Sequence, residues 1–342
     1  MTTGAAHRTL WPFAFAAAAG SLALLGCDQL TFATTCASDQ ECPVAYRCDL
    51  VSSYCVDANG PPTPGLSNLP GPLLCSSSKD LNVSGNLVVD TDQGTINGVA
   101  APTLQVVEQR APAPAIAVFS FARIELSAGS RLTVIGARAL ALLACDTVDL
   151  GGIVDVSAAT TQAPVDMARG GPGGYHGGSK GLPGHGPGAG AVGEGADTSN
   201  GMQSAGSGGG AFGGAGGSGG PFTGQVAGAG GSSCGTTSLV PLLGGSGGAG
   251  QVVVAGYGPD GDHPGPGGGG GGAVQITAGT RLTIRRGGGV KAAGGGGGET
   301  GNGGGGGGGA GGAILIEAPA IAIESGAILA ANGGGGAAGD CS

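Results

Sequence analysis

The sequence predicts an all-β protein whose main domain is a parallel β-helix, a solenoid built from stacked short strands. Three observations support this prediction. Short apolar segments recur along the chain, aliphatic side chains alternate with small or charged ones within each segment, and glycine or alanine separates the segments. Alternation at every second residue indicates strands, and a repeat of about twenty residues indicates stacked coils. A two-sheet β-sandwich is the alternative that the same alternation allows.

The clearest repeat lies between residues 313 and 331, where isoleucines stand at spaced positions: Ile314, Ile316, Ile321, Ile323 and Ile328. An earlier segment places its aliphatic residues almost identically, at Val274, Ile276, Leu282, Ile284 and Val290. We therefore expect Ile276 and Ile316 to stack in one column. Further back, residues 124–134 match 274–284 position by position, with Arg131 opposite Arg281. Residues 141–150 match 314–323, and their inward side chains are predicted to be Leu143, Val148 and Leu150.

Composition limits both the core and the partners. The chain has 342 residues, 82 of them glycine, and only 4% are aromatic. Because only the repeats can bury a core, we expect one main domain rather than two. The net charge is −9 and no run of Lys or Arg interrupts the glycine tracts, so the chain lacks the basic surface that nucleic-acid binding requires.

The N-terminus has the pattern of a secretory signal. Arg8 precedes an apolar run over residues 10–25, which is too short for a permanent membrane span. The run ends Leu-Leu-Gly-Cys at residues 24–27, a string that resembles the lipobox of bacterial lipoproteins. That resemblance implies a signal peptide over 1–26, acylation of Cys27 and attachment to a membrane through the lipid. Ordinary secretion, with Cys27 as a free or paired thiol, is the alternative.

A compact knob over residues 27–56 holds four cysteines in addition to Cys27: Cys36, Cys42, Cys48 and Cys55. So short a segment cannot bury a sufficient core, and in an exported chain four cysteines predict two disulfides. Three connectivities are possible. A zinc site is the competing interpretation, although these gaps lack the close cysteine pairs of structural zinc sites. The string resembles the Cys-rich knobs that follow the lipid anchor of bacterial surface lipoproteins.

Four more cysteines follow the knob, namely Cys75, Cys145, Cys234 and Cys341. Their even number predicts full pairing outside the cell, with the partners left open. We expect Cys341 to fix the C-terminal end of the chain and Cys234 to fix the glycine-rich insert.

A proline-rich linker over 57–74 leads into the main domain, residues 75–342, which contains a glycine-rich insert over 158–250. Two interpretations of this and similar glycine runs remain open. They are flexible linkers, which is the usual behaviour of Gly/Ser tracts. Alternatively, their local period of three allows polyproline-II strands packed side by side, since three residues complete one turn of that helix.

Few residue patterns indicate chemistry. Asp146, Asp149 and Asp155 alternate with aliphatic residues and are predicted to point outward from one coil, where they either form a solvated face or act in polysaccharide cleavage. Residues 260–263, Asp-Gly-Asp-His, resemble a single calcium-binding nonapeptide, which needs tandem copies. His176 and His185 lack a third ligand and are expected to be exposed. Gly-x-Ser-x-Gly around Ser218 and Ser246 is a chance match in so glycine-rich a chain. We predict no catalytic residue, metal or cofactor.

Lipobox, cysteine-rich knob, proline-rich linker and glycine-rich β-repeats together resemble the glycine-rich surface lipoproteins of gliding bacteria, often called PE-PGRS-like. The Pro-Glu domain of that name is absent from this chain. The resemblance implies a non-enzymatic protein, lipid-anchored at the outer membrane or cell surface, for adhesion, matrix contact or surface structure. Its expected partners are the membrane and a polysaccharide or extracellular matrix. A polysaccharide lyase or glycosidase is the alternative.

Overall fold

The computed structural model describes most of the chain beyond the N-terminal region. The described residues are 36, 38–42, 46–49, 54–57, 66–69, 77–159, 168–198, 201–222, 224–252, 265–298 and 304–338. The predicted signal peptide, Cys27, Cys75, residues 260–263 and Cys341 lie outside them. The chain divides into units 1–32 and 33–342, and every described residue belongs to the second. No helix in the described ranges is long and apolar enough to cross a bilayer.

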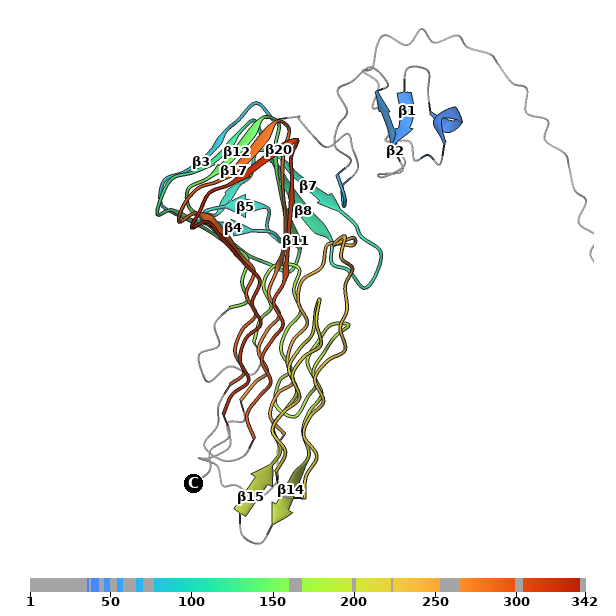
Figure 1. The fold of residues 1–342 in the computed structure, drawn as a ribbon, viewed down its shortest axis with the longest axis vertical. Coiled ribbons are helices and arrows are strands. Elements are labelled where there is room, and N and C mark those ends of the chain that lie inside the picture. Colours follow the sequence, from blue (N-terminus) through green and yellow to red (C-terminus); the bar gives the residue numbers. More distant parts are fainter. Residues whose placement is uncertain are drawn as a thin grey trace, which may run out of the picture. The chain divides into compact units, whose positions relative to one another are not determined.

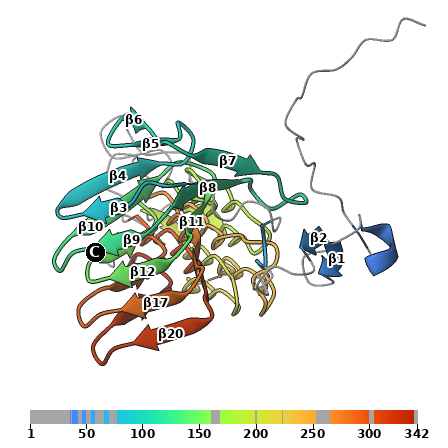
Figure 2. The ribbon, with the colours of Figure 1, turned by 90° about the horizontal axis from the view of Figure 1, so that it is seen from above.

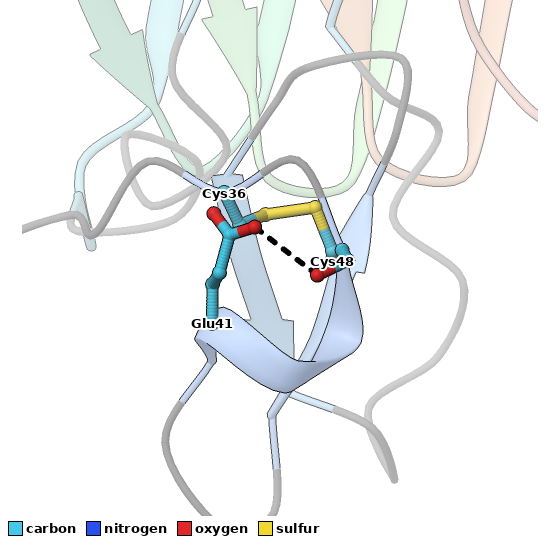
Figure 3. The surroundings of a disulfide bond; sticks show 4 residues. Cys36, Glu41 and Cys48 are labelled. Atoms are coloured by element: carbon cyan, nitrogen blue, oxygen red, sulfur yellow. Dashed lines mark hydrogen bonds between the residues drawn. A yellow bond between two sulfur atoms is a disulfide. The ribbon is translucent and has the colours of Figure 1, made fainter.

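The cysteine-rich knob contains one short helical turn and one hairpin: η1 (Asp39–Glu41), β1 (Tyr46–Asp49) and β2 (Tyr54–Asp57). The two strands are antiparallel. A disulfide joins Cys36 to Cys48, with their Cα atoms 5.8 Å apart, and Glu41 lies beside it (Figure 3). Cys42 is also disulfide-bonded. An isolated two-stranded hairpin is marginally stable, so these cross-links supply stability that so small a core cannot.

Three larger sheets form the body of the protein, and each takes its strands from successive repeats of the chain (Figures 1 and 2). The first sheet is parallel throughout and contains β3 (Leu81–Val83), β9 (Ile124–Leu126), β12 (Thr147–Leu150), β17 (Arg281–Ile284) and β20 (Ala320–Ile323). The second contains β7 (Leu104–Val107), β8 (Ile116–Phe121), β11 (Ala139–Ala144), β16 (Ala273–Ala278) and β19 (Ala313–Glu317), with β7 antiparallel to β8.

The third sheet has seven strands in the order β21, β18, β13, β10, β4, β5, β6. Its strands are β4 (Asn86–Asp90), β5 (Thr95–Ile96), β6 (Val99–Ala100), β10 (Arg131–Ile135), β13 (Ile153–Asp155), β18 (Gly289–Lys291) and β21 (Ile328–Ala330). Strands β4, β5 and β6 pair antiparallel, and the remaining pairs are parallel.

One apolar core is shared by the three sheets. In β12 the buried residues alternate with half-buried ones, and Val148 and Leu150 enter this core. Strands β8, β11 and β16 are instead buried along their whole length. Their outer face is covered by a second apolar cluster that includes Leu66, Leu69 and Leu242, so the second sheet has apolar side chains on both faces.

The predicted parallel β-helix is therefore wrong. The described residues form three separate sheets, two of them mixed, in place of a closed solenoid over residues 75–342. A two-sheet sandwich does not describe them either. The physical reason is that the chain does not wind continuously from coil to coil. It leaves the sheets after β13 and returns only at β16, and the intervening glycine-rich segments pack in another way.

The register also corrects the predicted alignment of the repeats. Ile276 and Ile316 are register partners in β16 and β19, as expected. Ile124, however, pairs with Val148 and not with the column of Val274. Arg131 lies in the third sheet and Arg281 in the first, while Leu143 packs in the second cluster. Because all the strands share the same alternation, pattern matching could not decide which sheet each one joins.

The glycine-rich segments pack as extended chains side by side, ending near the hairpin of β14 (Gly195–Thr198) and β15 (Gly201–Ser204) (Figure 1). Successive amides point to different neighbours. The amide of Gly247 donates to the carbonyl of His185, that of Gly248 to Gly268, and that of Ala249 to Gly208. Three residues after Gly247, the amide of Gly250 donates to Leu182, in the same neighbouring segment as His185. Three residues per turn is the geometry of a polyproline-II helix. These segments are packed structure and not flexible linkers. They are called the glycine bundle below and comprise residues 168–194, 205–222, 224–252, 265–272, 292–298, 304–312 and 331–338.

Close backbone contact explains why the glycine bundle excludes side chains. A Cβ atom added at Gly270 would lie 1.8 Å from the carbonyl oxygen of Gly245, and one added at Gly312 would lie 1.8 Å from that of Gly272. Adjacent chains hydrogen-bond through their main chains at this spacing. Packing therefore requires glycine at such positions, and the backbone hydrogen bonds offset the conformational entropy lost when glycine is ordered.

Amide exchange should reveal this periodic packing. Every amide from Gly244 to Gly250 donates to a backbone carbonyl, so we expect slow exchange throughout that segment. In the outer chain over 215–220, the amides of Gly216 and Gly219 donate to carbonyls, and we expect them to exchange more slowly than Gly217. Hydrogen exchange followed by NMR tests both expectations. Uniformly fast exchange over 244–250 would contradict the packed bundle.

Candidate functional site

Two of the three aspartates that were predicted to point outward, Asp146 and Asp149, lie on the outer side of the first sheet. In β12 the apolar residues face the core, so Asp149 is left on the outer side and Asp146 precedes the strand. Parallel pairing brings β9 and β17 alongside β12, and Glu125 and Thr283 occupy the positions next to Asp149. This outer side, called the charged face below, consists of the following residues: Arg123, Glu125, Asp146, Asp149, Thr280, Arg285 and Glu324.

Basic side chains from neighbouring repeats bind the aspartates of the charged face. Arg123 Nε lies 3.0 Å from Asp146 Oδ2, and Thr280 Oγ1 donates to Asp146 Oδ1 at 2.8 Å. Arg285 binds Asp149 with both Nε and Nη2, the latter at 2.5 Å, and its Nη1 also lies 3.3 Å from Glu324 Oε1. The ion pairs therefore join strands of different repeats.

Electrostatics oppose the role of a general acid for Asp146. The hydrogen bond from Thr280, followed by that from Arg123, lowers the pKa of Asp146, and Asp149 raises the pKa of Arg285. A carboxylic acid that protonates a leaving group at neutral pH needs a raised pKa, as in glycosidases. Asp146 has the opposite shift, and Asp149 is engaged by a guanidinium. The charged face is arranged as a set of structural ion pairs.

Asp155 does not join the other two aspartates, which corrects the prediction that all three point outward together. It lies in β13 of the third sheet, where its side chain is buried, forms an ion pair with Arg131 and accepts a hydrogen bond from the amide of Ser157. The chain changes sheets at Gly151 and Gly152. A Cβ atom at Gly152 would lie 2.2 Å from Ser130 Oγ, so the tight corner depends on glycine.

The lowered pKa of Asp146 predicts a pH dependence of stability. A carboxyl whose pKa is lower in the folded state than its ordinary 3.8 stabilises the fold above that pH, and this contribution is lost as the pH falls through the lowered value. We expect Asp146→Asn to melt below the wild type at pH 6, with the difference closing as the pH approaches 2. Thermal denaturation across this range measures it. An unchanged difference down to pH 2 would contradict the assignment.

The two histidines approach each other in the glycine bundle. Their ring centroids are 6.4 Å apart in an edge-to-face arrangement, with His185 exposed and His176 half-buried. His176 Nδ1 accepts a hydrogen bond from the amide of Gly170 at 3.0 Å. Burial lowers the pKa of His176, and His185 and Arg169 lower it further. The expectation that both are exposed therefore holds for His185 alone, and among the described residues no third metal ligand joins them.

The cysteines divide into bonded and free ones. Cys36, Cys42 and Cys48 bring their sulfur atoms within 4.8 Å of one another, but they are oxidised to disulfides and offer no thiolate to a metal. Cys145 and Cys234 are free thiols, so the prediction of full pairing is wrong for these two. Cys145 follows β11, whereas Cys234 lies in the glycine bundle.

Cys234 and Ser246 lie together in that bundle without forming a reactive pair. Cys234 Sγ donates to the carbonyl of Ala211 at 3.5 Å and lies 3.8 Å from Ser246 Oγ. Ser246 is buried, and its Oγ accepts a hydrogen bond from the amide of Gly188 at 2.9 Å. Cys234 therefore holds its part of the insert by a hydrogen bond and not by a disulfide. No described helix follows Ser246, so the Gly-x-Ser-x-Gly motif lacks the context of a nucleophile.

Sequence reasoning missed a polar network on the outer side of the second sheet. Asn68 Nδ2 donates to Gln275 Oε1 at 3.2 Å, and Gln275 Nε2 donates to Glu317 Oε2 at 2.7 Å. Ser67 Oγ donates to Glu317 Oε1 at 2.5 Å. Residues 66–69, within the predicted linker, thus bind the sheet. The only signal in the sequence was the polar Gln275 inside an apolar strand.

Comparison with known proteins adds no assignment. No family model matches the chain, and no curated protein or solved structure matches it. The fold and the site define a class in physical terms only: a protein of three sheets around one core, with ion pairs on one outer face and a packed glycine bundle. Function must be inferred from these features.

Proposed function

We propose that the protein is a non-enzymatic component of the cell envelope, anchored through a lipid on Cys27. Its packed glycine bundle would serve adhesion, matrix contact or surface structure. The observation that supports this proposal is that Asp146 and Asp149 both form ion pairs with arginines. The outer acids are thereby committed to holding neighbouring repeats together, and the glycine bundle presents main chain and few reactive side chains.

Physical reasoning supports a structural role for the glycine bundle. Its chains are joined by main-chain hydrogen bonds in several directions, as at Gly247, Gly248 and Ala249. Such a network resists bending better than a single chain of glycine, which is flexible in water. A protein that displays a surface away from a membrane needs this stiffness. The expected ligand is a polysaccharide or matrix polymer, bound by an outer surface without cleavage.

The anchoring part of the proposal is tested by substituting the cysteine. The wild-type chain and a Cys27→Ala variant would be expressed in a bacterium that processes lipoproteins. We expect the wild type in the membrane fraction with a mass increase from acylation, and Cys27→Ala without that mass. Cys145→Ala serves as the matched control, because it removes a thiol that lies in the β-sheet body. Wild type without acyl chains would refute the anchor.

The non-enzymatic part is tested on polysaccharides. Purified full-length protein would be incubated with acidic and neutral polysaccharides, and both product release and retention on the immobilised polymers would be measured. We expect retention on at least one polymer and no product. Product release that Asp149→Asn abolishes, and that Glu125→Gln leaves intact, would overturn the proposal in favour of a polysaccharide-cleaving enzyme.

A further inference from the structure

A groove runs along the glycine bundle between four of its extended chains. Its walls come from residues 206–210, 215–220, 305–310 and 333–337, and its volume is about 440 Å³. Glycine, alanine and serine line it, so its surface is mostly main chain. No residue of the charged face lines this glycine groove.

The amide groups of residues 304–312 point in different directions, and most of them donate to neighbouring chains. Three of these amides, those of Gly306, Gly309 and Gly312, donate to residues 298, 295 and 292 in one neighbouring chain. Two others, from Gly307 and Ala310, donate to residues 249 and 246 in a second neighbour. With three residues per turn, a third set of amides must point in a third direction.

That third set has no acceptor. The amides of Gly305 and Gly308 donate to no carbonyl among the described residues, although both residues are buried and both line the groove. Their own carbonyls accept from Ser207 and Gly210. In the free protein these two N–H groups are left to the solvent that enters the groove, since no backbone acceptor of the described chain reaches them. Two such groups, three residues apart, call for acceptors with the same spacing.

The opposite wall gives an independent argument. A Cβ atom added at Gly217 or Gly220 would meet nothing within 4 Å, whereas inside the bundle an added Cβ would collide with backbone, as at Gly270. Glycine costs more conformational entropy on folding than any other residue. No contact within the described chain requires glycine at these two positions. A further chain packed as closely as those inside the bundle would require it at both.

We propose that the glycine groove binds a glycine-rich strand of another polypeptide in the polyproline-II conformation. Carbonyl groups three residues apart in that strand would accept from Gly305 and Gly308, and glycine at every third position would face the wall at Gly217 and Gly220. The wall over 305–310 would span roughly 19 Å at about 3.1 Å per residue, or two turns of such a strand. The ligand is recognised by its main chain. This inference goes beyond the proposed function and does not depend on it.

NMR titration of the full-length protein with a synthetic peptide of Gly-Gly-Ser repeats tests the site. We expect the amide signals of Gly305 and Gly308 to shift and to gain protection from exchange. An otherwise identical peptide of Ala-Ala-Ser repeats should cause neither effect, because its side chains cannot pack against the wall. Unchanged Gly305 and Gly308 signals at millimolar Gly-Gly-Ser peptide would overturn the proposal.

A matched pair of variants locates the binding. Gly217→Leu adds a side chain to a residue that lines the groove, whereas Gly213→Leu adds the same side chain to an exposed glycine that also meets nothing within 4 Å and does not line the groove. Thermal denaturation first establishes that both variants fold. We expect Gly217→Leu to weaken peptide binding at least about tenfold, equivalent to about 1.4 kcal/mol, and Gly213→Leu to bind as the wild type does. Equal binding by both variants would refute the groove as the site.

Discussion

Replacing Gly270 by alanine is expected to destabilise the protein by at least about 3 kcal/mol, the upper end of the usual cost of an overpacked interior. The added methyl group would lie 1.8 Å from the carbonyl oxygen of Gly245 and 2.3 Å from its carbon. Neither Gly270 nor Gly245 can move away without breaking a hydrogen bond, because the amide of Gly245 donates to Gly271 and that of Gly270 donates to Tyr175. Chemical denaturation of the full chain measures the effect.

Gly213→Ala is the control for this substitution. Gly213 is exposed, lacks a positive φ and leaves open space for a Cβ atom. Alanine there should be neutral or should stabilise by about 0.4–1 kcal/mol, because it restricts the unfolded chain. The two substitutions are chemically identical, yet only Gly270→Ala should destabilise the protein. If Gly270→Ala were as harmless as Gly213→Ala, the close packing of the glycine bundle would be wrong.

Leu282→Ala should cost about 2–5 kcal/mol, the range found for large-to-small substitutions in cores. Leu282 in β17 is fully buried in the core that the three sheets share. Truncation removes its contacts and leaves a cavity that the surrounding strands cannot close, since they are fixed in register on both sides. Equilibrium unfolding in denaturant gives the difference in free energy.

Ile321→Ala provides the comparison, because Ile321 is the register partner of Leu282 in the last repeat. Its side chain is 47% exposed at the open end of the first sheet, so we expect truncation to cost about 1 kcal/mol or less. A cost equal to that of Leu282→Ala would mean that the β20 end is covered in solution. Measuring the pair together separates burial from residue type.

Prediction from sequence succeeded where a residue pattern is compatible with a single kind of structure. Alternating aliphatic residues such as Val148 and Leu150 indicated strands, and these residues lie in the core. The stacking of Ile276 on Ile316 was also predictable, since equivalent residues of a repeat pair in register. In the knob, four cysteines in a segment too short to bury a core indicated disulfides, and Cys36 and Cys48 form one.

Prediction failed where several strands carry the same signal. Ile124 was aligned with Val274, yet it pairs with Val148, because alternation does not encode which sheet a strand enters. The same ambiguity placed Asp155 with Asp146 and Asp149, although the glycine corner after β12 carries Asp155 into another sheet. It also led to the expectation of one closed solenoid, whereas the strands of the described main domain form three separate larger sheets and one hairpin.

By itself, the sequence determined that the chain forms strands from its aliphatic repeats and that its glycine tracts are too poor in side chains to build an apolar core. Only the tertiary structure decided what those tracts do. Glycine is equally compatible with a loose linker and with the closest packing a backbone can adopt, and the choice depends on whether neighbouring chains supply hydrogen bonds from several sides. At Gly247, Gly248 and Ala249 they do, through chains brought there from distant parts of the sequence.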